Sequence, residues 1–229
     1  MNWTLMWDSL PRLLAALPLT LELVALALAF GAVLAFATAL LRLSGNRVAV
    51  ALTSAYTFIF RGTPLLVQIF LIYYGLSQID LIRDSFLWPI LSQPMWCAIL
   101  ALALNTGAYT SEILRGAIET VPQGQVEAAR ACGMSRVRLF RRIVLPVAIR
   151  QMLPAYGNEV ILMVKASSLA STITMMEITG VARRMIAQTF AVFEIFIVAG
   201  ILYLLINFVA TRLIKHAEWR MTPYLRARA

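Results

Sequence analysis

Several charged side chains lie inside long apolar stretches of the sequence, where an ionised group is costly unless it has a partner or water. Glu159 and Lys165 belong to one such stretch, and Arg61 belongs to another. Glu159 and Lys165 are six residues apart, which places them roughly 120° apart around a helix and excludes an i,i+4 pair. Such groups either pair with other helices or bind a charged solute along a water-filled path, and the residues alone leave both open.

Further polar residues accompany this acid and this amine. Asn158 shares the helical face of Lys165, and hydroxyl side chains follow at Ser167 and Ser168. Hydroxyls in helices often bond back to their own backbone, but beside an acid they can also hold the ammonium and carboxylate of an amino acid. Lys165 can instead extend its amine to the membrane surface. The candidate solute path is therefore Asn158, Glu159, Lys165, Ser167 and Ser168.

The sequence Arg61-Gly62-Thr63-Pro64 predicts a break in its helix. Pro64 has no backbone N–H and disfavours helix at Thr63, so the carbonyls of Phe60 and Arg61 lose their helical partners. At membrane depth such a break is tolerated only where protein or water satisfies the backbone. These four residues are either a gate on the solute path or the anchor of a kink.

A second candidate site lies at residues 127–146, EAARACGMSRVRLFRRIVLP. This stretch concentrates positive charge within a mostly apolar chain. The first residues favour a helix, Gly133 can adopt the left-handed conformation that ends it, and Ser135 can cap a second helix. In that second helix the apolar residues recur at spacings of three and four, at Val137, Phe140, Val144 and Ala148. Such an elbow either lies on lipid headgroups or docks into a groove of another protein.

The elements that must position these residues are membrane helices. Of the 229 residues, 61% are hydrophobic and only 14% are charged, whereas soluble domains carry about 25% charged residues. Apolar stretches long enough to cross a bilayer of about 30 Å predict five spans, at 23–41, 48–79, 94–111, 154–176 and 195–211. We therefore predict one all-α transmembrane domain over residues 1–229.

The distribution of positive charge orients the predicted spans. Most of the 20 Lys and Arg residues follow the first, third and fifth spans, as far as Arg226 and Arg228, although Arg183 and Arg184 lie on the other side. Because positive charge beside a span is retained in the cytoplasm, we predict the N-terminus outside, the C-terminus inside and a cytoplasmic loop at about 115–150. The net charge of +9 is explained by these positive residues between the spans. They do not form one basic patch of the kind that binds nucleic acid, so we expect no nucleic-acid partner. The first residues lack a basic leader, so we expect no cleaved signal.

No motif in the sequence would let the chain drive chemistry itself. It has no G-x-x-x-x-G-K-[ST] loop for nucleotide phosphates and no His/Cys cluster for a metal. We predict that it is not an enzyme and holds no cofactor or metal. Any energy for moving a solute must then enter from another protein.

The elbow resembles the coupling loop of ABC-importer permeases. The family pattern E-A-A-x3-G-x9-I-x-L-P is matched at Glu127, Ala128, Ala129, Gly133, Ile143, Leu145 and Pro146. Residues 60–76, 102–129 and 153–180 also resemble permeases for polar amino acids, in particular the M-type subunits of histidine, lysine/arginine/ornithine and opine importers. The similarity extends over about residues 10–220.

The resemblance implies a type I ABC-importer permease fold in a multi-pass protein of the bacterial inner membrane. It implies import of basic amino acids (histidine, arginine, lysine or ornithine) or opines, by alternating access. The implied partners are a second, Q-type permease, two ATPase subunits that hold the ATP and Mg²⁺, an extracytoplasmic solute-binding protein, the amino-acid solute and membrane lipid. In that family the elbow docks into a cleft on the ATPase, so Glu127 and residues 128–133 would form the docking core.

Other classes of function can also use charges inside a membrane. An ion channel would not need the elbow, and a membrane-bound enzyme should bring catalytic side chains together. A scaffold could anchor an ATPase without moving a solute. A bulky residue in place of Gly133 separates these alternatives, because only a transporter should lose its coupling to an ATPase.

Overall fold

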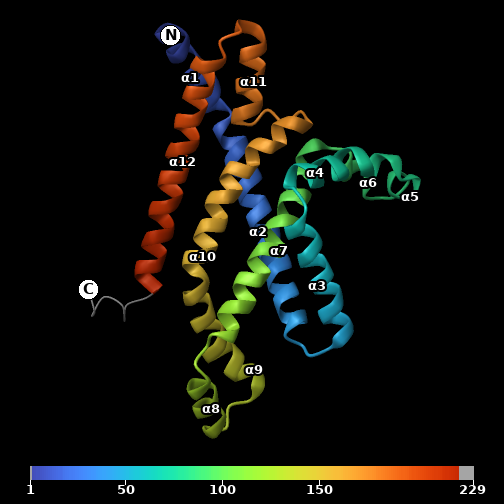
Figure 1. The fold of residues 1–229 in the computed structure, drawn as a ribbon, viewed down its shortest axis with the longest axis vertical. Coiled ribbons are helices and arrows are strands. Elements are labelled where there is room, and N and C mark those ends of the chain that lie inside the picture. The colour runs from blue at the N-terminus through green and yellow to red at the C-terminus, as the bar shows by residue number, and fades with distance from the viewer. Residues whose placement is uncertain (1, 222–229) are drawn as a thin grey trace.

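The computed structural model describes residues 2–221, which form helices and no strands (Figure 1). The helices are α1 (Trp3–Ala15), α2 (Leu17–Arg42), α3 (Arg47–Gly62), α4 (Leu65–Phe70), α5 (Asp80–Arg83), α6 (Trp88–Leu91), α7 (Pro94–Glu119), α8 (Gln123–Ala131), α9 (Arg136–Leu139), α10 (Leu145–Ala166), α11 (Ile178–Thr189) and α12 (Val192–Met221). Leu71–Gly75 and Phe140–Val144 are π-helical turns, and Leu76–Gln78 and Ser167–Ile173 are 3₁₀ helices. The all-α prediction is confirmed, whereas Arg226 and Arg228 lie outside the described residues.

Three of the described helices are long and apolar enough to cross a membrane, namely α2, α7 and α12, with mean hydropathies of 2.5, 1.3 and 2.4. Two bent pairs raise the number to as many as five. The first pair, Arg47–Gly62 with Leu65–Gln78, bends by 107°, and the second, Arg136–Ile173 with Ile178–Thr189, bends by 48°. The count of five spans and their orientation stay predictions.

The predicted break is confirmed, because the chain turns sharply at Pro64, between α3 and α4. One helix starts earlier than expected, since Pro154 lies inside α10 and does not begin it. That helix begins at Leu145 with Pro146 in its first turn, where a missing N–H costs little. Packing of α10 against α7 and α12 keeps it continuous through Pro154.

The main apolar core lies where α2, α7 and α10 meet, around residues such as Leu23, Leu102 and Met163. The closest approach is between α2 and α7, at Gly31 and Gly107. A Cβ on Gly107 would lie 3.1 Å from Cβ of Leu34 and 3.3 Å from the Gly31 carbonyl oxygen, and a Cβ on Gly31 would overlap Thr106. Small residues let membrane helices pack this closely.

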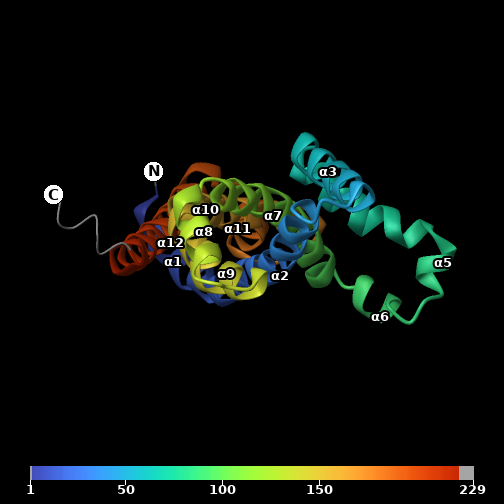
Figure 2. The ribbon, with the colours of Figure 1, turned by 90° about the horizontal axis from the view of Figure 1, so that it is seen from below.

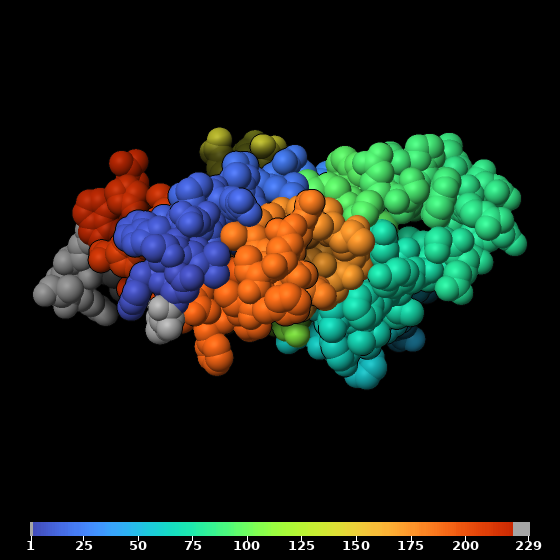
Figure 3. Space-filling model, turned by 90° about the horizontal axis from the view of Figure 1, so that it is seen from above, coloured from blue at the N-terminus to red at the C-terminus, as the bar shows by residue number. Residues whose placement is uncertain are grey.

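The two ends of the bundle carry different structures. In Figure 1, α8 and α9 lie at one end, and α1 and α11 lie at the other. The segment with α5 and α6 projects sideways from the bundle, as the views along its axis from below (Figure 2) and from above (Figure 3) also show. The α8–α9 end has a small apolar core of its own, formed by Ala117, Val121, Ala129, Leu139, Val144 and Ala148.

Candidate coupling elbow and solute path

The bend between α8 and α9 is formed by Gly133. Its φ is +73°, in the left-handed region, which an L-residue with a side chain adopts only at a cost. The N–H of Gly133 donates to the Arg130 carbonyl at 2.9 Å, and that of Met134 donates to the Ala129 carbonyl at 3.1 Å, which closes the end of α8. Ser135 precedes α9, as predicted, but its side chain makes no capping bond.

The elbow buries only part of its predicted apolar stripe. Val144 and Ala148 are buried and Phe140 is half-buried, but Val137 is 68% exposed. The π-helical turn Phe140–Val144 explains the difference, because it adds a residue to the turn and rotates α9 relative to α10.

The residues of the coupling-loop pattern divide between the surface and the interior of the elbow. Glu127, Ala128 and Gly133 are exposed, whereas Ala129 is buried in the elbow core. The remaining three residues of the pattern are half-buried, namely Ile143, Leu145 and Pro146. Four arginines lie on α9 and the π-helical turn after it, and none makes an ion pair among the described residues. They are Arg136, Arg138, Arg141 and Arg142. The exposed side of the elbow thus presents a small acidic and apolar patch beside unpaired positive charge.

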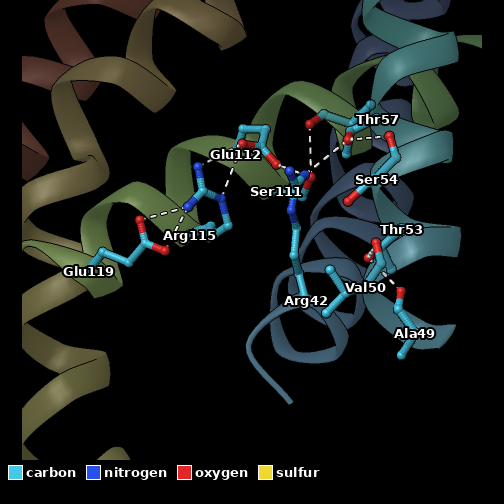
Figure 4. A network of polar contacts seen from close by, with 11 residues as sticks. Arg42, Ala49, Val50, Thr53, Ser54, Thr57, Ser111, Glu112, Arg115 and Glu119 are labelled. Carbon is cyan, nitrogen blue, oxygen red and sulfur yellow. Dashed lines mark hydrogen bonds and ion pairs between the residues drawn. The ribbon is translucent and has the colours of Figure 1, made fainter. Parts of the chain in front are cut away.

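A ladder of charges joins the elbow end of α7 to α2 and α3 (Figure 4). Arg115 pairs with Glu119 at 2.6 Å and with Glu112 at 3.0 Å, and Glu112 also pairs with Arg42 at the end of α2. Arg42 donates to the hydroxyl of Thr57 on α3 at 3.0 Å. The Glu112–Arg115 pair is local, at i,i+3 spacing on one helix, whereas the Arg42–Glu112 contact spans 70 positions and has no local sequence signal.

The break at Pro64 has its backbone satisfied by side chains. The Phe60 carbonyl accepts from Nε2 of Gln68 at 2.9 Å and from Nδ2 of Asn105 at 3.0 Å. The Arg61 carbonyl accepts from the hydroxyl of Tyr109 at 3.4 Å. The sequence predicted the loss of helical partners at these two carbonyls, but not the α7 residues that replace them.

The predicted solute-path residues point in different directions from α10 and the 3₁₀ helix after it. Glu159 is only 5% exposed and lies on α10, which packs against α7. Asn158 and Lys165, in contrast, are exposed.

The two serines of the predicted path also separate. Ser167 is buried and donates to the Val164 carbonyl at 2.8 Å, and Ser168 donates to the Lys165 carbonyl at 2.7 Å. Lys165 and Ser168 line a separate cavity of about 300 Å³ with Thr179 and Tyr203. The five residues therefore do not form one site within this chain.

One buried acid was missed by the sequence analysis. Glu177 is fully buried and accepts from the N–H groups of Thr179 and Gly180, both at 2.9 Å, and from the hydroxyl of Tyr203 at 2.6 Å. It caps α11 at the bend that follows the 3₁₀ helix. An acid directly before a helical segment that opens with Ile-Thr-Gly is the signal that could have identified it.

The site holds charged and hydrogen-bonding groups suited to binding. Within residues 2–221, no group of three or more His, Cys, Asp or Glu side chains could hold a metal ion. The elbow provides an exposed surface, and the helical break provides polar groups that bond to the middle of α7.

Comparison with known proteins identifies close relatives along almost the whole chain. Residues 27–223 match the family described as binding-protein-dependent transport system inner membrane component. The octopine transport system permease protein OccM of Rhizobium radiobacter is 56% identical over 218 residues, covering 95% of this chain and 89% of that protein. The histidine/lysine/arginine/ornithine transport system permease protein HisM of Escherichia coli is 42% identical over 209 residues, covering 91% and 88%.

A solved structure has the same fold. The crystal structure of an amino acid ABC transporter with histidines matches with a TM-score of 0.85 at 33% identity, covering 96% of this chain and 99% of that chain.

Proposed function

The chain belongs to the family of binding-protein-dependent transport system inner membrane components, as a permease subunit of an ABC importer, and from this premise we propose that it carries basic amino acids or opines. The named solutes of the relatives support this choice, since they are octopine, histidine, lysine, arginine and ornithine. The acid Glu159, buried at the middle of α10, suits a cationic side chain.

The elbow is the proposed site of energy coupling. Glu127, Ala128, Ala129, Gly133, Ile143, Leu145 and Pro146 dock into a separate ATPase, which holds the ATP and Mg²⁺ and carries out the hydrolysis. The importer contains two ATPase subunits, a second, Q-type permease and an extracytoplasmic solute-binding protein. The separate apolar core of the elbow supports this role, because an elbow that is packed internally moves as one body when its partner closes.

The helical break is the proposed gate. Irregular backbone at membrane depth occurs where protein or water satisfies it, and transporter sites are often built from such broken helices. Arg61, Gly62, Thr63 and Pro64 lie at the 107° bend, and the Phe60 carbonyl beside them bonds to Asn105 near the middle of α7. This arrangement is the observation that carries the proposal. The path continues over Asn158, Glu159, Lys165, Ser167 and Ser168, and the second permease closes its open side.

The proposed topology has five spans in the bacterial inner membrane, with the N-terminus outside and the C-terminus inside. Residues 1–229 form one permease domain. Solute-loaded binding protein favours the outward-facing state, and closure of the ATPases drives the elbow between the two states. A ligand shifts this equilibrium only by its differential affinity for the two states.

Uptake by the reconstituted importer tests the proposed solute. Proteoliposomes with both permeases, the ATPase and the binding protein should take up labelled L-arginine only when ATP is present. Glu159→Gln should lower that uptake by about 10- to 150-fold, because a charged hydrogen bond is worth about 1.5–3 kcal/mol. Glu22→Gln, at an exposed acid on α2, is the matched control and should transport normally. Normal arginine uptake by Glu159→Gln would contradict the role of this acid.

A further inference from the structure

A cavity of about 540 Å³ lies between α3 and α7, and Arg42 of α2 reaches into it. Its lining includes Arg42, Thr57, Arg61, Tyr109 and Glu112. Sites for small molecules commonly enclose about 300–1,000 Å³. The space is therefore sufficient for a solute of amino-acid size.

The charges around this cavity leave one cation without an ion pair. Arg42 is neutralised by Glu112, and Arg115 is neutralised by Glu112 and Glu119. Arg61 forms no ion pair among residues 2–221. The group of three arginines and two glutamates thus carries one uncompensated positive charge, which belongs to Arg61.

Arg61 lines this cavity and is exposed, so a solute in the cavity can reach its guanidinium. Its backbone follows the Phe60 carbonyl, which bonds to Asn105 near the middle of α7. Its guanidinium carbon lies 5.2 Å from the centroid of the Tyr109 ring. Stacking on a ring uses the flat face of a guanidinium, whereas the N–H groups on its edge can bind a carboxylate by two parallel hydrogen bonds.

We propose that Arg61 holds the carboxylate of the transported amino acid or opine in the α3–α7 cavity. This subsite rests on the proposed function and adds to it the recognition of the acidic end of the solute. The same chemistry would also accept a free inorganic anion, and the experiment separates the two sources.

Equilibrium binding to the purified importer without its binding protein tests the subsite. The probes are L-arginine and agmatine, which is the same molecule without its carboxylate. Wild-type importer should bind L-arginine about tenfold more tightly than agmatine, as expected for one charged hydrogen-bonding contact. Arg61→Gln should remove this preference by weakening L-arginine alone, and Arg61→Lys should retain part of it. Arg83→Gln, at an exposed arginine on α5, is the matched control and should behave as wild type.

The possible outcomes separate this subsite from the proposed function. If Arg61→Gln keeps the wild-type ratio of L-arginine to agmatine affinity while uptake continues, the carboxylate subsite is wrong and the importer stands. If phosphate binds to the wild-type importer but not to Arg61→Gln, while both proteins bind L-arginine equally, the cavity holds an inorganic anion only, which overturns the subsite. If wild-type importer neither binds L-arginine nor transports it, the proposed solute fails together with the subsite. A normal gel-filtration profile for each variant shows that the complex assembles.

Discussion

Single residues decide whether the elbow has its bent form, and Gly133 is the clearest case. The ideal Cβ positions on Gly133 and on Gly116 of α7 both have nothing within 4 Å, but only Gly133 has a positive φ, of +73°. Any effect of a side chain at Gly133 that is absent at Gly116 therefore reports backbone strain and not a clash within the chain.

Gly133→Val should uncouple the importer. A left-handed L-residue costs about 1–2 kcal/mol, and a β-branched residue resists that conformation further, so the turn after α8 should rearrange. We expect reduced copurification of the ATPase and loss of the ATP hydrolysis that the loaded binding protein stimulates. Gly116→Val should retain both, and equal losses in the two variants would show that the bend is not required.

Residue chemistry also explains which parts of the site could be predicted from the sequence. The left-handed turn at Gly133 and the break at Pro64 follow from the properties of those residues, so they were predictable without neighbours. The directions of Asn158, Glu159 and Lys165 depend on the helices that pack against α10, and so the sequence could not separate them. Glu177 was missed because its partner Tyr203 lies 26 positions away on α12.

At the scale of helices, the charge ladder connects the coupling end of α7 with the α2–α3 hairpin. It runs from Glu119, four residues before α8 begins, to Arg42 and Thr57. The side chains of Arg42 and Glu112 are only 24% and 15% exposed, so water screens the pair less than it would screen a surface pair. Movement of the elbow should therefore carry the α2–α3 hairpin with it.

Glu112→Gln should destabilise this connection. It leaves Arg42 and Arg115 sharing a neutral amide, and we expect a loss of about 1.5–3 kcal/mol as a lower thermal unfolding midpoint of the permease complex. Asp80→Asn removes an exposed pair of the same i,i+3 spacing, between Asp80 and Arg83, and should cost less than about 1 kcal/mol. Equal midpoints for the two variants would contradict a structural role for the ladder.

The helix boundaries show where sequence patterns stop being sufficient. Long apolar stretches predicted α2, α7 and α12 because hydrophobicity alone marks them. The π-helical turn Phe140–Val144 was not predicted, so Val137 was expected on the wrong face. Pro154 was expected to begin a span, but packing along α10 outweighed the single backbone bond that it removes.

At the scale of the whole molecule, orientation across the membrane can be tested with the native cysteines. Cys132 is exposed at the end of α8 and Cys97 is buried in the core, and neither forms a disulfide. The proposed topology places Cys132 on the cytoplasmic side, within the surface that meets the ATPase.

A membrane-impermeant maleimide should therefore label Cys132 in inverted membrane vesicles and leave it unlabelled in intact spheroplasts. Bound ATPase should reduce the labelling in inverted vesicles. Cys132→Ser should abolish the signal, whereas Cys97→Ser should leave it unchanged. Labelling in spheroplasts would reverse the proposed orientation and remove the basis for coupling at the elbow.

The contact of Gly31 with α7 has a consequence for how the molecule changes shape. With no space for even a methyl group between the two backbones, α2 and α7 cannot slide past each other without a steric clash. These two helices should therefore move together as one rigid unit, so that any change of shape takes place at other helix contacts.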